Sequence, residues 1–361
     1  MPVLDAVGFD ALPGWNDDDP RGAWGAFQAS CQALRFRPAW RDACAEAGKL
    51  ASPDAAAIRR YFEANFVPHR ASTPEGATDG LATGYYEPLL RGSRARRAPY
   101  LYPLFAPPDD LLTIDLSSIN PELRNMRLRG RLDGRKVVPY WSRAEIDRGM
   151  APLAGKELVW VDDPIEGFFL EVQGSGRVQL DNGQTIRMAY ADQNGQPYQS
   201  IGRWLIDRGE LKVNEASMAG IKGWARANPA RVTELLDQNP SYVFFREQAV
   251  GDPAAGPIGA AGVALTPERS VAVDPRFVPL GAPVFINTTQ PGSGNSGDAP
   301  LRKLMVAQDT GGAIRGPVRV DYFWGFGADA GALAGRMRQQ LKVWVLLPRG
   351  FPLKPDGTPA Q

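Results

Sequence analysis

The C-terminal part of this chain constrains its fold most strongly, because three short β-forming runs there each carry an aspartate at or near an end. The runs and their acids are 270–274 with Asp274, 304–309 with Asp309, and 319–323 with Asp321. A glycine-rich turn that contains Gly311 and Gly312 closely follows the second run. Such runs predict a β-scaffold that gathers three carboxyl groups in one place, with Asp309 as the one that performs chemistry.

Length and composition limit the classes of protein to which the chain can belong. With 361 residues, of which 43% are hydrophobic and 22% charged, it is long enough for two domains with buried cores. The 39 glycines and 32 prolines favour a loop-rich β architecture over a helical bundle. A formal net charge of +1 argues against nucleic acid as the main partner. No apolar run reaches the roughly 18 residues of a membrane-spanning helix, so we expect no transmembrane segment.

Hydrophobic periodicity divides the chain into helical and β-forming regions. Helical spacing over 21–48 and a capping sequence at Ser52-Pro53-Asp54 predict helices near the N-terminus. Gly80–Pro88 and Phe168–Gln173 are rich in strand formers. The pattern predicts an all-β barrel that is interrupted, at about 91–242, by a second domain of strands and short helices.

Asp309 has two interpretations. An aspartate at a strand end often caps the following turn through its own backbone. In the functional interpretation, the apolar run before Asp309 buries it partly and favours the protonated form that a general acid needs. Gly311 and Gly312 would let a ligand approach the backbone closely. Asp274 and Asp321 would hold or tune Asp309, although turn capping explains each of them equally well.

Two other catalytic classes receive little support. Asp309-Thr310-Gly311 is also the tripeptide of aspartic proteases, but those enzymes need two such carboxylates, and only a dimer would supply the second here. His69, the single histidine, follows Val67-Pro68 and is predicted to lie in a loop. Mechanisms that depend on a Ser–His or Cys–His pair are therefore set aside.

The two cysteines, Cys31 and Cys44, fall on successive helical segments. A disulfide between them is geometrically feasible in an oxidising compartment, and two buried reduced thiols are the alternative. One pair without a nearby histidine does not make a zinc site, so we expect no metal.

Aromatic and glycine-rich segments are the candidates for ligand binding. Rings suited to stacking on sugar faces are those of Tyr85, Tyr86, Tyr190, Tyr198, Tyr322 and Trp324, although core packing explains most of them as well. The segment Gln173-Gly174-Ser175-Gly176 fits either a binding loop or a simple turn. It is not a phosphate loop, because no Lys-Ser/Thr pair follows it.

Five collinear segments resemble a known family, the MltA-type membrane-bound lytic murein transglycosylases. They are Thr83–Pro88, Val172–Gly176, Tyr198–Gly209, Asn239–Phe245 and the region of Asp274, Asp309 and Asp321, which forms the module named after its three aspartates. The resemblance implies a mainly β protein with N-terminal helices and a double-psi β-barrel built from 1–90 plus 243–361. It also implies a β-rich domain inserted at 91–242, and a groove between the two domains that holds a glycan strand.

The family cleaves the β-1,4 bond between N-acetylmuramic acid and N-acetylglucosamine in peptidoglycan and leaves a 1,6-anhydromuramoyl end. The resemblance therefore implies a lyase in which Asp309 is the single acid and base, oriented or polarised by Asp321 and Asp274. One carboxyl group suffices because the sugar's own O6 attacks C1, an intramolecular step with a high effective molarity. No cofactor is implied.

The resemblance, together with the placement of aromatic residues and glycines, predicts the residues that bind the glycan. They are Thr83, Gly84, Tyr85, Tyr86, Gln173, Gly174, Ser175, Gly176, Tyr190, Tyr198, Ser200, Gly311 and Gly312. One rival is an inverting endoglucanase on the same barrel, which would use Asp309 and a second aspartate. Another is a non-catalytic glycan-binding module similar to the expansins.

The family is usually lipid-anchored in the periplasm, whereas this N-terminus shows neither a leader nor a cysteine that could carry a lipid. We therefore expect a periplasmic protein that is associated with the outer membrane in its full-length form, with Cys31 and Cys44 bridged. Its partners would be the glycan strands of peptidoglycan, and we expect it to act as a monomer.

Overall fold

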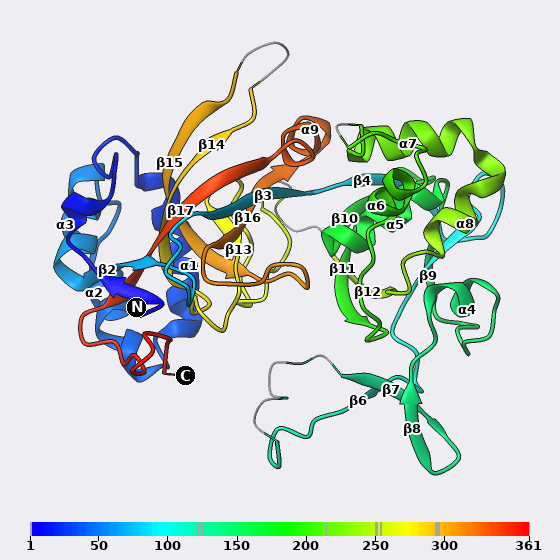
Figure 1. Ribbon diagram of the computed structural model, residues 1–361, viewed down its shortest axis with the longest axis horizontal. Coiled ribbons are helices and arrows are strands. Elements are labelled where there is room, and N and C mark those ends of the chain that lie inside the picture. Colours follow the sequence, from blue (N-terminus) through cyan, green and yellow to red (C-terminus); the bar gives the residue numbers. More distant parts are fainter. Residues whose placement is uncertain are drawn as a thin grey trace. The chain divides into compact units, whose positions relative to one another are not determined.

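The computed structural model describes residues 2–120, 123, 126, 128–213, 215–249, 252, 255–292 and 297–360. It is mainly β, with 26% helix and 32% strand, which confirms the predicted fold class. Contacts divide the chain into a first unit, Met1–Tyr86 with Asp252–Gln361, and a second unit, Glu87–Gly251. The first unit therefore contains both ends of the chain (Figure 1).

Three helices form the N-terminal part of the first unit: α1 (Arg21–Leu34), α2 (Arg41–Lys49) and α3 (Ala55–Asn65), with short 3-10 turns η1 (Phe9–Ala11) and η2 (Pro38–Trp40). Asp54, rather than Ser52, is the N-cap of α3, and its carboxyl group accepts the N–H of Ala57. The helices pack through the aromatic rings of Trp24, Phe27, Tyr61, Phe62 and Phe66. A disulfide joins Cys31 on α1 to Cys44 on α2, with an S–S distance of 2.14 Å.

Six strands close a barrel in the first unit. The order β17–β14–β15–β13–β16–β3 returns to β17, and β2 and β1 extend the sheet beyond β17. The strands are β1 (Leu4–Ala6), β2 (Phe66–Ala71), β3 (Gly80–Glu87), β13 (Ser270–Ala272), β14 (Pro283–Gln290), β15 (Ala299–Asp309), β16 (Arg319–Phe326) and β17 (Arg338–Pro348), and α9 (Ala328–Ala334) follows β16. The predicted barrel is thus confirmed. His69 lies in β2 and is buried, so its predicted loop placement is wrong.

Strand β15 is the part of the barrel that leads to Asp309. Its residues 304–308 are all buried, and α1 packs against the strand. Burial on both faces explains why this run is continuously apolar up to Gln308 instead of alternating. Antiparallel pairing with β14 extends from Val306 to Ala299. Asp309 therefore lies at the end of a strand that is held in place by β13, β14 and α1.

The second unit is built on a mixed sheet of order β12–β11–β10–β4–β9–β5 and a small antiparallel sheet of order β6–β7–β8. Its strands are β4 (Leu89–Ser93), β5 (Tyr102–Phe105), β6 (Leu112–Thr113), β7 (Arg129–Asp133), β8 (Lys136–Pro139), β9 (Glu157–Val161), β10 (Ser175–Leu180), β11 (Thr185–Gln193) and β12 (Val243–Gln248). Its helices are α4 (Arg143–Asp147), α5 (Pro164–Gln173), α6 (Ile201–Asp207), α7 (Met218–Ala227) and α8 (Val232–Leu236), with η4 (Pro229–Arg231) before α8.

The unit borders differ from the predicted domain borders. Strand β4 pairs in parallel with β10, and β12 pairs antiparallel with β11, so both lie in the sheet of the second unit. The second unit accordingly runs over Glu87–Gly251, where the sequence predicted 91–242. Composition does not reveal which sheet an edge segment joins, because that choice depends on pairing with strands far away in the sequence.

Residues Phe168–Gln173, predicted as a strand, form the second half of helix α5. Asp163 caps this helix by accepting the N–H groups of Ile165 and Glu166, and Pro164 occupies its first turn. Gly174, with φ of 81°, ends it. The buried residues Ile165, Phe168 and Phe169 recur with helical rather than strand spacing, which the short apolar run conceals.

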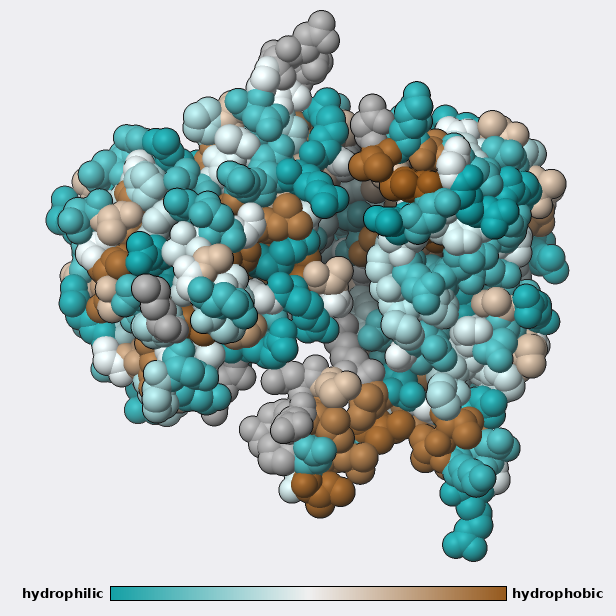
Figure 2. Space-filling model, viewed as in Figure 1, coloured by the Kyte–Doolittle hydropathy of each residue, from teal (hydrophilic) through white to brown (hydrophobic). Residues whose placement is uncertain are grey.

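Surface polarity varies over the second unit. Leu132 on β7 and Val137 on β8 are cross-strand partners and are 62% and 52% exposed. The small sheet that carries them shows hydrophobic residues on the displayed face (Figure 2). Among the residues that the structure describes, none of the helices combines the length and apolarity needed to cross a membrane.

Candidate active site

Strand register places two of the three aspartates on either side of one residue of β13. Ala272 pairs with Asp309 on the parallel strand β15 and with Asp321 on the antiparallel strand β16. Residues that face one another on adjacent strands project from the same face of the sheet, so Asp309 and Asp321 share a face. Asp274 lies two residues beyond β13, and Val273 donates its N–H to the main-chain carbonyl of Asp309 at 3.0 Å.

Asp309 is half-buried, and both of its carboxyl oxygens accept hydrogen bonds. Oδ2 accepts the hydroxyl group of Tyr85 at 3.0 Å, and Oδ1 accepts the backbone N–H of Ala260 at 3.0 Å. These donors come from β3 and from the loop before β13, both distant in sequence. The carboxyl group is therefore oriented by tertiary contacts.

Gln308 anchors the strand immediately before this carboxyl group. Its side chain is fully buried and donates to the carbonyl oxygen of Ala26 at 2.8 Å and to Oγ of Ser30 at 2.9 Å, both on α1. Its Oε1 accepts the hydroxyl group of Ser270 at 2.5 Å. A buried amide with such partners locks the end of β15 to α1 and β13.

An apolar cluster adjoins the acids. It consists of the buried side chains of Tyr85, Leu265, Ala272, Ile314 and Phe323. Burial, followed by the charges of Asp309 and Asp321, raises the pKa of Tyr85 well above its ordinary value of 10.0. Tyr85 therefore keeps its proton and serves as a neutral hydroxyl group.

Asp321 is held by a relay of two side chains. Its Oδ1 accepts the Thr83 hydroxyl group at 2.6 Å, and Oγ1 of Thr83 accepts Nη2 of Arg319 at 2.8 Å. Burial raises the pKa of Asp321 to about 6, the hydrogen bond from Thr83 and the charge of Arg319 oppose this rise, and the charge of Asp309 adds to it. Asp321 is therefore electrostatically coupled to Asp309 and mostly ionised at neutral pH.

Asp274 is a fixed anion. Its fully buried carboxyl group accepts Nη2 of Arg276 at 2.6 Å and the N–H of Gly316 at 2.8 Å. Burial opposes ionisation, but the hydrogen bonds from Arg276 and Gly316 outweigh it and hold the pKa of Asp274 below its ordinary value. Because Gly316 lies in the loop after Asp309, Asp274 ties that loop to the end of β13.

Strand β3 presents Thr83 and Tyr85 on one face, where they contact Asp321 and Asp309. The glycine between them is required by packing, since a Cβ on Gly84 would lie 2.6 Å from Nε1 of Trp324. Tyr86 packs on Gly331 of α9, where a Cβ would lie 2.7 Å from its ring. Of the four predicted residues of β3, Thr83 and Tyr85 thus contact the acids, whereas Gly84 and Tyr86 pack against Trp324 and α9.

The two glycines after Asp309 differ. A Cβ on Gly311 would meet Ile314 at 2.8 Å, so this position is restricted by the cluster below it. Gly312 is exposed, and an added Cβ would meet open space. Of the pair, Gly312 has the unobstructed backbone that a ligand could approach.

The predicted binding residues of the second unit lie around the end of α5 and the start of α6. Gly174 caps α5 and accepts the N–H of Tyr190 at 2.8 Å through its carbonyl oxygen, while Gln173 ends the helix and Ser175 begins β10. A Cβ on Gly176 would lie 2.3 Å from Leu170. The fold itself thus requires both glycines, and a ligand role for this segment stays a prediction.

Ser200 is the N-cap of α6 and accepts the N–H of Arg203 at 3.2 Å. Of the six aromatic residues considered as sugar platforms, Tyr85, Tyr86, Tyr322 and Trp324 are buried, Tyr190 is partly buried, and Tyr198 is 51% exposed. Tyr198 is therefore the most exposed of these six residues, although burial of its hydroxyl group raises the pKa of that group.

Sequence reasoning missed one polar feature beside Asp309 and one inside the second unit. One is the turn 259–262, whose Ala260 N–H binds Asp309; the run Gly-Ala-Ala-Gly was its only signal. The other is Glu87, a fully buried carboxylate in the second unit that is paired with Arg177 and Arg187. The position of Glu87, directly after Tyr85-Tyr86 and before Pro88, could have indicated a buried acid that needs basic partners.

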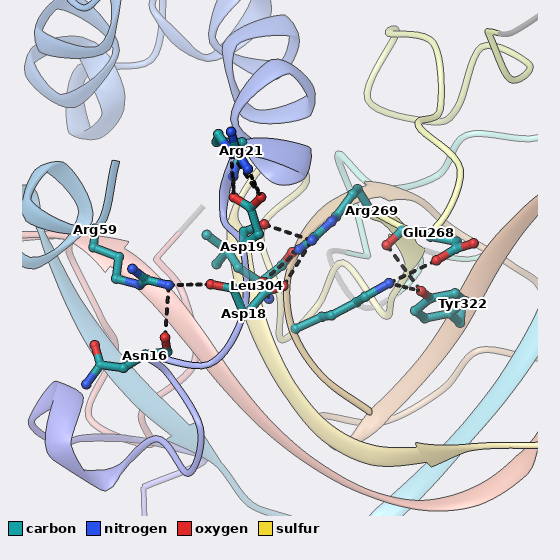
Figure 3. A network of polar contacts seen from close by, with 10 residues as sticks. Asn16, Asp18, Asp19, Arg21, Arg59, Glu268, Arg269, Leu304 and Tyr322 are labelled. Atoms are coloured by element: carbon teal, nitrogen blue, oxygen red, sulfur yellow. Dashed lines mark hydrogen bonds and ion pairs between the residues drawn. The ribbon is translucent and has the colours of Figure 1, made fainter. Parts of the chain in front are cut away.

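A second polar network supports the strands that carry the acids. Arg269, next to β13, binds both carboxyl oxygens of Asp18 at 2.7 and 2.9 Å (Figure 3). The same carboxylate accepts the N–H of Leu304 on β15 at 2.8 Å. The N-terminal segment therefore joins the start of β13 to the middle of β15, five residues before Asp309.

Comparisons with known proteins match this arrangement. Two family models fit the chain, the MltA specific insert domain over residues 81–246 and the 3D domain over residues 269–347. The structure of LtgG, a lytic transglycosylase of Burkholderia pseudomallei, is 49% identical, covers 97% of this chain and 96% of that chain, and has a TM-score of 0.63. The chain belongs to the MltA family.

Other MltA proteins extend the comparison. The membrane-bound lytic murein transglycosylase A of Escherichia coli K12 is 36% identical over 270 residues, which are 73% of this chain. The match spans 64% of that relative's length. The structure of E. coli MltA with bound chitohexaose is 28% identical, covers 96% of this chain and 95% of that chain, and has a TM-score of 0.71.

Proposed function

We propose that this MltA-family protein is a lytic murein transglycosylase, which cleaves the β-1,4 bond between N-acetylmuramic acid and N-acetylglucosamine and leaves a 1,6-anhydromuramoyl end. The environment of Asp309 carries the proposal. Its carboxyl group is half-buried and accepts hydrogen bonds from two neutral donors, the Tyr85 hydroxyl group and the Ala260 N–H. Asp274, by contrast, is kept ionised by a guanidinium group.

The proposed reaction uses Asp309 twice. Protonated Asp309 gives its proton to the glycosidic oxygen as the bond from C1 to that oxygen breaks. The carboxylate then takes the proton of O6 as O6 bonds to C1, so the nucleophile comes from the substrate itself. Ionised Asp321 supports the first step, because its charge disfavours a second negative charge on its neighbour.

The alternative is an inverting glycoside hydrolase on the same barrel, with Asp309 as the acid and a second aspartate such as Asp321 as the base. Such an enzyme needs a carboxylate that activates water on the opposite face of the sugar. Asp321 is a constrained base, because Thr83 binds its Oδ1 at 2.6 Å and the apolar surroundings raise its pKa to about 6. These contacts suit a residue that tunes Asp309 better than one that handles water.

We propose peptidoglycan glycan strands as the substrate, contacted at least by Tyr198, Ser200 and Gly312, which are the exposed members of the predicted binding set. The chitohexaose bound to the E. coli relative supports an N-acetylglucosamine polymer as ligand. Thr83 and Tyr85 would act on the substrate through the aspartates that they hold.

We also propose a periplasmic location with association to the outer membrane, and action as a monomer. The curated E. coli relative is named as membrane-bound, which supports the membrane association. The Cys31–Cys44 disulfide supports an oxidising compartment.

The test is mass spectrometry of purified murein after digestion with the native protein and with Asp309→Asn. We expect 1,6-anhydromuropeptides from the native protein and none above background from the variant. Muropeptides with reducing ends would support the hydrolase instead. Binding to murein without any cleavage by the native protein would support a non-catalytic module.

A further inference from the structure

The pairing of β13 with β15 shifts by one residue beside Asp309. Val271 faces Ala307, whereas the next residue of β13, Ala272, faces Asp309. Strand β15 therefore advances by two residues where β13 advances by one, and Gln308 is the extra residue. This arrangement is a β-bulge, a feature that is rare between parallel strands and enriched beside active sites, where it redirects a side chain.

The bulge determines the face of the sheet on which Asp309 lies. Successive residues of an unbroken strand point to opposite faces, so a one-residue shift moves a side chain to the other face. In an unbroken register Ala272 would face Gln308. Asp309 would then project from the face opposite to that of Asp321, which also pairs with Ala272. The bulge places both carboxyl groups on the same face.

The direction of the Gln308 side chain agrees with this interpretation. Ser270 and Ala272 are two residues apart on β13 and therefore share a face. Oε1 of Gln308 accepts the Ser270 hydroxyl group at 2.5 Å, while Asp309 pairs with Ala272. Two neighbouring residues of β15 thus turn toward the same side of β13, whereas an unbroken strand would direct them to opposite faces.

The buried amide of Gln308 stabilises the bulge. Its Nε2 donates to the carbonyl oxygen of Ala26 at 2.8 Å and to Oγ of Ser30 at 2.9 Å, both on α1. With the bond from Ser270, the amide uses both of its hydrogens and its oxygen inside the protein. A return to an unbroken register would move the amide away from these partners and leave buried polar groups unbonded, which costs free energy.

The main chain of Gln308 positions the turn 259–262 as well. Its carbonyl oxygen accepts the N–H of Ala261 at 2.9 Å, and the preceding residue, Ala260, donates to Oδ1 of Asp309 at 3.0 Å. A Cβ on Gly259 would lie 2.5 Å from the same carbonyl oxygen, so the turn packs directly on the bulge. The bulge therefore sets the position of the Asp309 carboxyl group and of one of its donors.

We propose that Gln308 is a positioning residue for the catalytic step, because its buried amide fixes the bulge that turns Asp309 toward the face of Asp321. This inference rests on the proposed transglycosylase function. Gln308 is fully buried against α1 and acts through Asp309, so it should affect the chemical step rather than glycan binding. Helix α1 contributes to catalysis through the two acceptors that it offers to this amide.

Gln308→Met tests the proposal, because methionine fills a similar volume without an amide. We expect kcat for the release of 1,6-anhydromuropeptides to fall about a hundredfold, as for a catalytic group misplaced by about 1 Å, while KM stays within about twofold. Ser30→Ala removes one of the two acceptors on α1 and should lower kcat about threefold, again without a change in KM. This milder variant decides the question if Gln308→Met does not fold.

A double-mutant cycle with Asp321→Asn distinguishes positioning from a general loss of stability. In the native protein Asp321→Asn should lower kcat, because the two carboxyl groups share a face. If Gln308→Met turns Asp309 away from that face, Asp321→Asn should lower kcat little further in this background. Effects that multiply as if independent would contradict the proposed role of Gln308.

The matched control is Tyr61→Phe, in the helices of the same unit. The buried Tyr61 hydroxyl group donates to the carbonyl oxygen of Ala43 on α2 at 2.6 Å. Its loss should lower the thermal stability and leave kcat unchanged at a temperature at which circular dichroism shows the protein to be folded. Native kcat values for folded Gln308→Met, or for Ser30→Ala, would overturn the proposal.

The outcomes separate this inference from the function on which it rests. If the native protein releases no 1,6-anhydro product, the proposed function fails. If the native protein releases that product, Asp309→Asn does not, and the Gln308 and Ser30 variants turn over at the native rate, the function stands and the role of Gln308 alone is wrong.

Discussion

At the scale of single residues, the surroundings of the site aspartates differ in how well they stabilise the ionised carboxylate. Arg276 and the Gly316 N–H stabilise ionised Asp274, and the bond to Gly316 connects the end of β13 to the loop after Asp309. Asp321 sits in an apolar surrounding that penalises its charge, yet the Thr83–Arg319 relay keeps it ionised at neutral pH. A carboxylate that destabilises the fold is expected where its charge is useful.

Asp321→Asn should stabilise the protein at neutral pH while it lowers activity. The pKa of Asp321 rises from 3.8 to about 6 on folding, so stability present below pH 4 is lost as the pH rises through 6. The loss is at most about 3 kcal/mol in the free energy of unfolding. Urea titrations should show the variant as the more stable protein at pH 7 and equal to the native protein near pH 4. A constant difference at both pH values would contradict this origin.

Thr83→Val should weaken catalysis through Asp321. The Thr83 hydroxyl group lowers the pKa of Asp321, so its removal should raise that pKa further and leave less anion beside Asp309 at neutral pH. We expect kcat/KM to fall about tenfold at pH 7, with the acidic limb of the pH profile moved to higher pH. Thr83→Ser keeps the donor and should restore most of the activity. Equal activities of the Val and Ser variants would show that Thr83 acts by packing alone.

The candidate site could be predicted from sequence where chemistry resides in side chains. Asp309, Asp321 and Asp274 are recognisable because each accompanies one of three short β-forming runs, and Thr83 and Tyr85 alternate on another strand. The Ala260 N–H was beyond reach, since a backbone donor has no residue identity and its position depends on a turn that packs on Gln308.

At the scale of elements, the same contrast holds for the fold. Strand β15 was predictable because burial on both faces demands a long apolar run. Helix α5 was not, because Phe168–Gln173 taken without Asp163 and Pro164 matches a strand as well as a helix. The assignment of β4 and β12 to the second unit depends on pairing with β10 and β11, which local sequence does not encode.

Asp18→Ala should destabilise the first unit, because it removes the carboxylate that joins Arg269 to β15. Both side chains are nearly buried, and the substitution leaves the guanidinium group without its carboxylate, with only the carbonyl oxygens of Leu304 and Asp19 as acceptors. We expect a loss of about 3 kcal/mol in the free energy of unfolding, measured by denaturant titration. Asp19→Ala is the matched control, since the neighbouring Asp19–Arg21 pair is exposed and should contribute little. Equal losses from the two substitutions would contradict a special role for Asp18.

At the scale of the whole molecule, the chain leaves one compact unit at Tyr86 and returns to it at Asp252. The barrel takes β3 from before the second unit and its other five strands from after it, so it closes only when distant parts of the chain meet. The second unit is continuous in sequence and has hydrophobic cores of its own, and helix α5 contributes residues to two of them. Continuity and separate cores favour independent unfolding.

Calorimetry should therefore resolve two unfolding transitions, each sensitive to its own core. Leu170 and Phe285 are fully buried in the second and first unit, respectively. Leu170→Ala should lower the free energy of unfolding of the second unit by about 2–5 kcal/mol, and Phe285→Ala that of the first unit by about 3–5 kcal/mol. Each substitution leaves a cavity that its neighbours fill only in part, so the corresponding transition should move to lower temperature. Each variant serves as the control for the other. A single transition whose temperature both substitutions lower equally would mean that the barrel and the second unit unfold together. Destabilising either core would then also unfold the site that contains Asp309.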